Sequence, residues 1–71
     1  MFLTEFEQNY LRSVSQLGGA RLSGVALELV WQTLQCSEED FVAATSRMNY
    51  YCYISVIERR VHLTIVGERE I

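Results

Sequence analysis

The chain has 71 residues, which is enough for one domain covering residues 1–71 but not for two. Its formal net charge is −3, and its six basic residues, all arginine, do not form the basic stretch that dedicated nucleic-acid binders carry. No run of about 18 apolar residues could span a membrane, and the N-terminus does not resemble a signal peptide, so we expect a cytoplasmic protein.

The first helix is predicted to begin at Thr4. Thr4 and Glu7 match the T-x-x-E capping box, in which each side chain bonds the backbone N–H of the other residue. Gly18 and Gly19 are expected to end the helix, because glycine adopts the left-handed conformation without steric cost. The apolar residues at helical spacing, which should face the core, are Phe6, Tyr10, Leu11, Val14 and Leu17.

A second helix is predicted with Ser23 as its N-cap. Its apolar residues cover most of its circumference, which is typical of a helix at the centre of a domain. They are Val25, Ala26, Leu27, Leu29, Val30, Trp31 and Leu34. A short strand is expected just before this helix, near residues 20–22, where it would pair with a later hairpin.

The third helix has the clearest predicted start, with Ser37 as its N-cap. Carboxylates fill its first turn, where they interact favourably with the helix dipole. These are Glu38, Glu39 and Asp40. Phe41, Ala44 and Met48 follow at helical spacing and are expected in the core. Asn49 is expected to take the left-handed conformation that ends the helix.

A β-hairpin is predicted over residues 50–67, YYCYISVIERRVHLTIVG, because β-branched and aromatic runs flank a polar trio. A tip at Arg59 and Arg60, or a four-residue loop over 58–61, gives the same register. The predicted pairs are Ile54 with Ile65, Ser55 with Thr64, Val56 with Leu63 and Ile57 with His62. This register places the aliphatic side chains on one face, whereas a slip of one residue would mix the two faces.

This order of elements resembles the winged helix-turn-helix superfamily. The stretch TLQCSEEDFVAATSRM at residues 33–48 resembles the helix-turn-helix of that family, and VIERRVHLTI at 56–65 resembles its wing. The resemblance implies an α+β fold of three helices followed by a C-terminal β-hairpin. Two features depart from the pattern: the second helix is longer than usual, and the third helix has an acidic start where it would meet DNA.

The first functional hypothesis, implied by the resemblance, is a DNA-binding regulator of transcription. Its third helix would approach the major groove while the wing holds the DNA backbone, for which the planar guanidinium of arginine is well suited. The candidate DNA-binding residues are Thr45, Ser46, Arg47, Arg59 and Arg60. Alternatively, Arg47 only complements the dipole of its helix, and Arg59 and Arg60 are only the solvated tip of a hairpin.

The second hypothesis is a protein-interaction module on the same scaffold, such as a small inhibitor, adaptor or phage-type regulator. It depends on the acidic balance, the 49% hydrophobic content and the tyrosines at 50–53, because tyrosine is rigid, large and tipped by a polar group. The candidate interface residues are Phe2, Leu3, Tyr51 and Tyr53. A homodimer is expected, since a small domain can bury surplus apolar surface between two copies.

No motif predicts catalysis or metal binding. Cys36 and Cys52 are expected to be buried thiols, and two cysteines with His62 are too few for a tetrahedral zinc site in one chain. No nucleophile lies at a recognisable spacing from His62. We therefore expect a non-enzymatic protein without cofactor, metal or small-molecule substrate, whose partner is either DNA or a larger protein.

Overall fold

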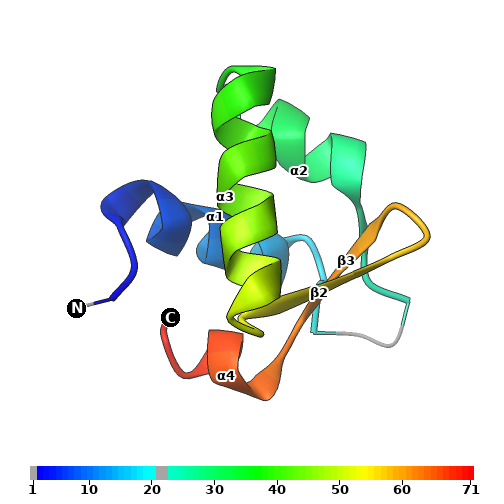
Figure 1. Ribbon diagram of the computed structural model, residues 1–71. Coiled ribbons are helices and arrows are strands. Elements are labelled where there is room, and N and C mark those ends of the chain that lie inside the picture. Colours follow the sequence, from blue (N-terminus) through cyan, green and yellow to red (C-terminus); the bar gives the residue numbers. More distant parts are fainter. Residues whose placement is uncertain (1, 21–22) are drawn as a thin grey trace.

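The computed structural model describes residues 2–20 and 23–71, and it shows helices packed around one small antiparallel sheet (Figure 1). The predicted fold class, α+β with three helices followed by a C-terminal hairpin, is confirmed. A short fourth helix after the hairpin was not predicted. The elements are α1 (Glu5–Gln16), β1 (Val25–Ala26), α2 (Leu27–Leu34), α3 (Glu38–Tyr50), β2 (Ile54–Ile57), β3 (Arg60–Leu63) and α4 (Ile65–Glu68).

Helix α1 begins as predicted, with a complete capping box. The N–H of Thr4 donates to Glu7 Oε1 at 3.0 Å, and the N–H of Glu7 donates to Thr4 Oγ1 at 3.1 Å. The helix ends at Gln16, and Gly18 takes the left-handed conformation with φ of 98°. The fully buried residues of its apolar face are Tyr10, Leu11 and Val14.

Among the described residues, the strand that pairs with the hairpin is β1, whereas the predicted strand near residues 20–22 lies mostly outside them. Ala20 lies in a turn, and residues 21–22 are outside the described ranges. In β1, Val25 pairs with Val61 and Ala26 pairs with Arg60, both antiparallel. The carbonyl oxygen of Gly19 also accepts the N–H of Leu63 in β3, at 2.8 Å. Strand β1 continues directly into α2.

Helix α2 starts at Leu27 rather than after Ser23, because the two preceding residues belong to β1. Its N-cap, Ala26, has no side chain that can bond the helix end. The N–H of Leu27 instead donates to the carbonyl oxygen of Arg59 in the hairpin turn, at 2.9 Å. Val30 is the residue of α2 that is fully buried. The helix predicted to be central thus lies at the surface, with part of its apolar face open.

Helix α3 has the predicted start and the predicted core face. Ser37 Oγ accepts the N–H of Asp40 at 3.1 Å. The buried residues on its core face are Phe41, Ala44 and Met48. The helix does not end at Asn49: it continues to Tyr50, and the exposed Cys52 takes the left-handed conformation with φ of 65°. Asn49 is still helical, and its side chain accepts a hydrogen bond from the backbone of β2.

The register of the hairpin differs from the prediction by two residues. The observed pairs are Ile54 with Leu63, Ser55 with His62, Val56 with Val61 and Ile57 with Arg60. The turn therefore consists of Glu58 and Arg59 alone, with φ of 50° and 62°, as a two-residue type I′ turn requires. Ile65, expected in the second strand, begins α4. Because the shift is an even number of residues, the side chains keep their predicted faces.

The sheet has the order β1–β3–β2, so β2 forms one of its outer edges. At that edge the N–H of Val56 donates to Asn49 Oδ1 at 3.3 Å. Helix α4 folds back against the start of the hairpin, where Gly67 is buried. A Cβ atom on Gly67 would lie 2.1 Å from the carbonyl oxygen of Tyr53, so the close approach requires glycine.

One hydrophobic core joins α1, α3 and the sheet. Its largest fully buried side chains are Tyr10, Leu11, Val14, Val30, Met48, Ile54 and Val61. The hairpin extends past this core on the side that carries α2, which brings its turn to the first turn of that helix (Figure 1). Within residues 2–20 and 23–71, we find no helix of the length and apolar character needed to cross a membrane.

Candidate functional site: a groove between two helices and the hairpin turn

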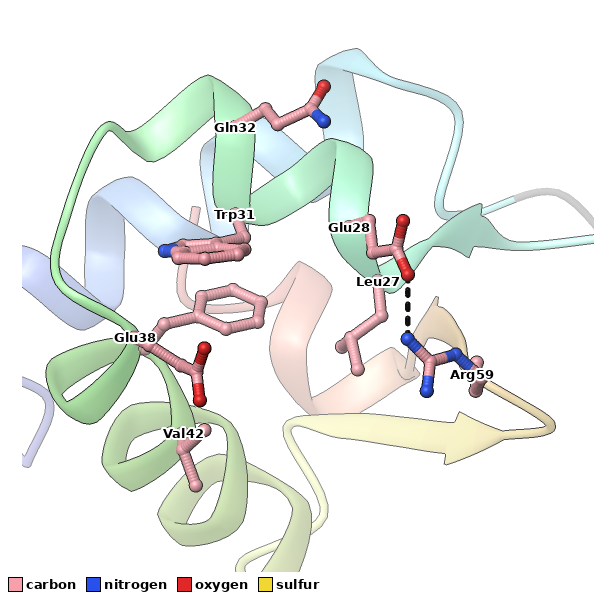
Figure 2. Close-up of a pocket in the computed structure, with 8 residues that line it drawn as sticks. Leu27, Glu28, Trp31, Gln32, Glu38, Val42 and Arg59 are labelled. Atoms are coloured by element: carbon pink, nitrogen blue, oxygen red, sulfur yellow. Dashed lines mark hydrogen bonds and ion pairs between the residues drawn. The ribbon is translucent and has the colours of Figure 1, made fainter.

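An open groove of about 380 Å³ lies between α2, α3 and the hairpin turn. We call it the α2–α3 groove. In Figure 2, Leu27 and Trp31 project from α2 toward Glu38 and Val42 of α3, and Arg59 of the turn lies beside Glu28 at one end. The lining residues are Leu27, Glu28, Trp31, Gln32, Glu38, Phe41, Val42 and Arg59. The site thus combines side chains from three parts of the chain that only the tertiary fold brings together.

The floor of the groove is aromatic and held in place from below. The rings of Trp31 and Phe41 stack with centroids 6.4 Å apart and an interplanar angle of 28°. Trp31 Nε1–H donates to the carbonyl oxygen of Cys36 at 2.8 Å, which orients the indole. Phe41 stacks in turn on the buried ring of Tyr10, at 5.3 Å and 11°. The floor is therefore preorganised by the core and is not a loose surface patch.

The rim of the groove carries two carboxylates and one guanidinium. Arg59 Nη2 donates to Glu28 Oε1 at 2.7 Å, and both side chains are exposed, at 74% and 68%. Exposed ion pairs of this kind contribute about 0–1 kcal/mol, so this one is easily exchanged for another partner. The side chain of Glu38, on the α3 side, makes no hydrogen bond or ion pair with any other residue in the described part of the chain.

The second arginine of the turn region binds the protein's own backbone. Arg60 Nε–H donates to the carbonyl oxygen of Ser23 at 2.6 Å, and Nη2 donates to that of Gly24 at 3.2 Å. A smaller hollow of about 290 Å³ adjoins the groove here and shares Leu27, Glu28 and Arg59 with it. Of the two arginines predicted at the wing tip, Arg59 thus lines the groove, whereas Arg60 holds the segment that leads into β1.

The predicted DNA-facing residues of α3 lie apart from the groove. Arg47 forms an ion pair with the buried carboxylate of Glu7 and donates to the carbonyl oxygen of Phe2 at 3.0 Å. The Thr45 hydroxyl shares a hydrogen bond of 2.7 Å with the hydroxyl of Tyr10. Ser46 is exposed. Two of these three side chains are therefore occupied by contacts with the N-terminal segment and α1.

The predicted interface residues at the tyrosine-rich end form a separate aromatic cluster. The ring of Phe2 meets that of Tyr51 edge-on at 4.8 Å and stacks on that of Tyr53 at 6.2 Å. The guanidinium of Arg47 lies 4.6 Å from the centroid of the Phe2 ring. Phe2 and Tyr51 are exposed, whereas Leu3 is 5% exposed and belongs to the core. Of the two predicted interface residues at the N-terminus, Phe2 and Leu3, only Phe2 is exposed to solvent.

Two titratable groups with shifted pKa values lie outside the groove. Burial raises the pKa of Glu7, but hydrogen bonds from the Thr4 N–H and from Arg47, with the positive charge of Arg47, outweigh it, and the pKa is lowered below 4.5. Burial raises the pKa of Tyr10 to about 12. Both groups are parts of the packed core beneath α1 and α3. Their shifts follow from structural contacts rather than from a site that faces solvent.

Among the described residues, no group of three or more histidine, cysteine, aspartate or glutamate side chains is placed to hold a metal ion. Cys36 and Cys52 are free thiols, and neither is fully buried, contrary to expectation. Comparison of the chain with known protein families, with curated proteins and with solved structures finds no match. The function must therefore be argued from the groove and its surroundings.

Sequence reasoning missed the groove because its floor consists of residues assigned to the core. Leu27, Trp31 and Phe41 have the spacing of buried residues, and they do pack against the core cluster. A signal was nevertheless present in α2. Helix α2 has eight residues, and apolar side chains cover most of its circumference. A helix that packs against the core on one side only must leave some of these side chains open to solvent. Glu28 and Gln32, one turn apart, mark the rim of what remains open.

Proposed function

We propose that this chain is a non-enzymatic protein-interaction module of winged-helix type that binds a segment of a partner protein in the α2–α3 groove. One observation carries the proposal: a preorganised aromatic floor, in which the partly exposed Trp31 rests on the buried Phe41, lies between two carboxylate-bearing rims. Concave sites with apolar floors and a few polar groups are the usual places where proteins hold ligands. The rim charges add specificity to an otherwise apolar contact.

The charges near the groove favour a protein partner over DNA. The exposed residues of α3 include no basic side chain; they are Glu38, Glu39, Asp40, Val42, Ala43, Ser46, Asn49 and Tyr50. A helix that enters the major groove without a cation, and with three carboxylates in its first turn, would repel the phosphates on both sides. Arg47 and Arg60 make intramolecular contacts that a DNA contact would have to break.

The winged-helix assignment is part of the proposal. It is supported by the element order, by the sheet order β1–β3–β2 and by the two-residue turn at the hairpin tip. The competing DNA-binding hypothesis is supported by one feature, the 74% exposed side chain of Arg59 at that tip. Homodimer formation stays a prediction, for which the exposed rings of Phe2, Tyr50 and Tyr51 are one part of the available apolar surface.

Selection of a displayed random-peptide library on the immobilised chain tests the proposal. Recovered peptides are titrated against the chain while the fluorescence of Trp31, its only tryptophan, reports on the groove. Val42→Arg fills the groove mouth from an exposed position, and Ala43→Arg adds the same charge to α3 outside the groove. We expect Val42→Arg to weaken binding about tenfold or more, and Ala43→Arg to leave it unchanged.

Two results would contradict the proposal. One is a library that yields no peptide, or only peptides whose affinity is equal for Val42→Arg and the parent. The other is tight binding of a labelled random-sequence DNA duplex that weakens steeply with salt and is lost in the Arg59→Ala/Arg60→Ala double variant. That second result would favour the DNA-binding hypothesis, because non-specific DNA affinity depends on phosphate contacts.

A further inference from the structure

The α2–α3 groove has a charge imbalance at its rim. Glu28 and Glu38 contribute two carboxylates from opposite helices, and Arg59 is the one cation among the residues that line the groove. Arg59 pairs with Glu28, while the carboxylate of Glu38 has no polar partner in the described part of the chain. A ligand with one positive charge would therefore balance the charge of the groove, and Glu38 is the carboxylate available to pair with it.

The floor selects which cation fits best. The indole of Trp31 is the partly exposed ring of the floor. It rests on the buried Phe41 ring and is held by its bond to the Cys36 carbonyl. A guanidinium is planar and weakly hydrated, so it stacks on an aromatic face while its edge donates two hydrogen bonds to a carboxylate. The ammonium group of lysine can also pair with a carboxylate, but only as a point charge without the planar, two-bond geometry. The combination of a partly exposed indole and a carboxylate that lines the same groove favours arginine over lysine.

Arg59 shows how a guanidinium binds at this rim. It reaches the groove from the hairpin turn and makes a 2.7 Å hydrogen bond with Glu28. The backbone of the turn is tied to α2 through the bond from the Leu27 N–H, so the side chain stays near the groove whether or not the ion pair is formed. Both partners of the pair are mostly exposed, and such pairs exchange readily with competing charges.

We propose that the specific ligand of the α2–α3 groove is an arginine side chain within the partner segment, held between Glu38 and the Trp31 ring, with Arg59 acting as an intramolecular competitor that neutralises Glu28 at the same rim. This inference rests on the proposed function of the groove. It adds that an arginine is required for tight binding, and that the hairpin turn lowers the affinity for it.

The peptides recovered from the random library test the requirement for arginine. Each is resynthesised with its arginine replaced by lysine or by citrulline, which has nearly the same shape but no charge, and binding is followed through Trp31 fluorescence. We expect citrulline to weaken binding at least about tenfold and lysine to weaken it less. Peptides that occupy the groove without any arginine, or that tolerate citrulline, would overturn the inference and leave the proposed function standing. A library that yields no groove-binding peptide would overturn both.

Variants of the chain test the roles of the rim. Glu38→Gln should weaken the arginine peptide about tenfold, whereas Glu39→Gln, an exposed neighbour outside the groove, should not change its affinity. Arg59→Ala should strengthen binding about threefold or more, because it frees Glu28 and removes a positive charge. Weaker binding in Arg59→Ala, or equal effects of the two glutamine variants, would overturn the inference.

Discussion

The ion pair between Glu7 and Arg47 ties three parts of the chain together. Glu7 completes the cap of α1 and accepts from Arg47 of α3, although its side chain is only 4% exposed. Arg47 also bonds the carbonyl oxygen of Phe2 and lies over its ring. A buried carboxylate that loses its partner is costly. At this one residue, local helix capping and long-range packing therefore depend on the same carboxylate.

Glu7→Gln should lower the free energy of unfolding by about 1–2 kcal/mol near neutral pH. Glutamine can still cap α1, so the loss reports on the ion pair, whose strength is moderated by the partial exposure of Arg47. Glu7→Ala removes the cap as well and should cost more. Thermal unfolding measured by circular dichroism checks both values. Equal melting temperatures for the parent and Glu7→Gln would show that the pair contributes nothing.

The same carboxyl makes stability depend on pH. Its pKa is lower in the folded chain than its ordinary value of 4.5, so its stabilising effect is complete above that value. The effect is lost as the pH falls through the lower, folded-state pKa. The melting temperature of the parent should drop across this acidic range, and that of Glu7→Gln should drop less. Parallel curves for the two proteins would contradict the assignment.

At the scale of elements, the hairpin turn is held by contacts rather than by favourable turn residues. Glu58 and Arg59 both take positive φ, a region that costs residues other than glycine and asparagine roughly 1–2 kcal/mol each. The carbonyl of Arg59 accepts from Leu27, and Arg60 holds the loop before β1. These distant contacts fix the position of the turn against its local preference.

Glu58→Asn should therefore stabilise the protein by about 0.5–1 kcal/mol, because asparagine tolerates the left-handed conformation. Glu58→Val should destabilise it by about 1 kcal/mol or more, since a β-branched side chain is strained there. Glu58 is exposed, so neither change disturbs packing. Unfolding in denaturant gives the comparison. If the two variants unfold at the same midpoint, the turn is not type I′.

The contrast between helices and hairpin shows what the sequence could predict. The starts of α1 and α3 were predicted correctly because Thr4, Glu7 and Ser37 act on backbone groups within one turn. The start of α2 and the register of the hairpin were not predicted correctly. Both depend on contacts between β1 with the start of α2 and the hairpin around Arg59, and these segments are far apart in the chain. Turn chemistry favoured a longer loop, and tertiary contacts overrode it.

The candidate site was predicted only in part for a related reason. Arg59 was identified from its place at the hairpin tip, where charge is easily recognised in a sequence. Trp31 and Phe41 were assigned to the core, and periodicity cannot distinguish a residue inside the core from one at the floor of a groove. The distinction depends on what covers the side chain, which is decided by the placement of α2 against the turn.

At the scale of the whole molecule, the C-terminal helix completes the packing of a small domain. Gly67→Ala should lower the free energy of unfolding by about 1–3 kcal/mol, because the new methyl group would overlap the Tyr53 carbonyl and displace α4. Val66→Ala, next to it but partly exposed, should change stability by less. Equilibrium unfolding in guanidinium chloride distinguishes them. Equal midpoints would mean that α4 contributes nothing to the fold.

The contact between Asn49 and Val56 has a consequence for the protein in concentrated solution. A sheet of three short strands ends in β2, and a free edge offers backbone donors to any other chain that can extend alongside it. Here the last turn of α3 supplies an amide oxygen that already occupies the N–H of Val56. A neighbouring copy that added a strand at this edge would have to displace a side chain of the same molecule first. The Asn49 side chain thus makes the addition of a strand at this position of the edge more costly.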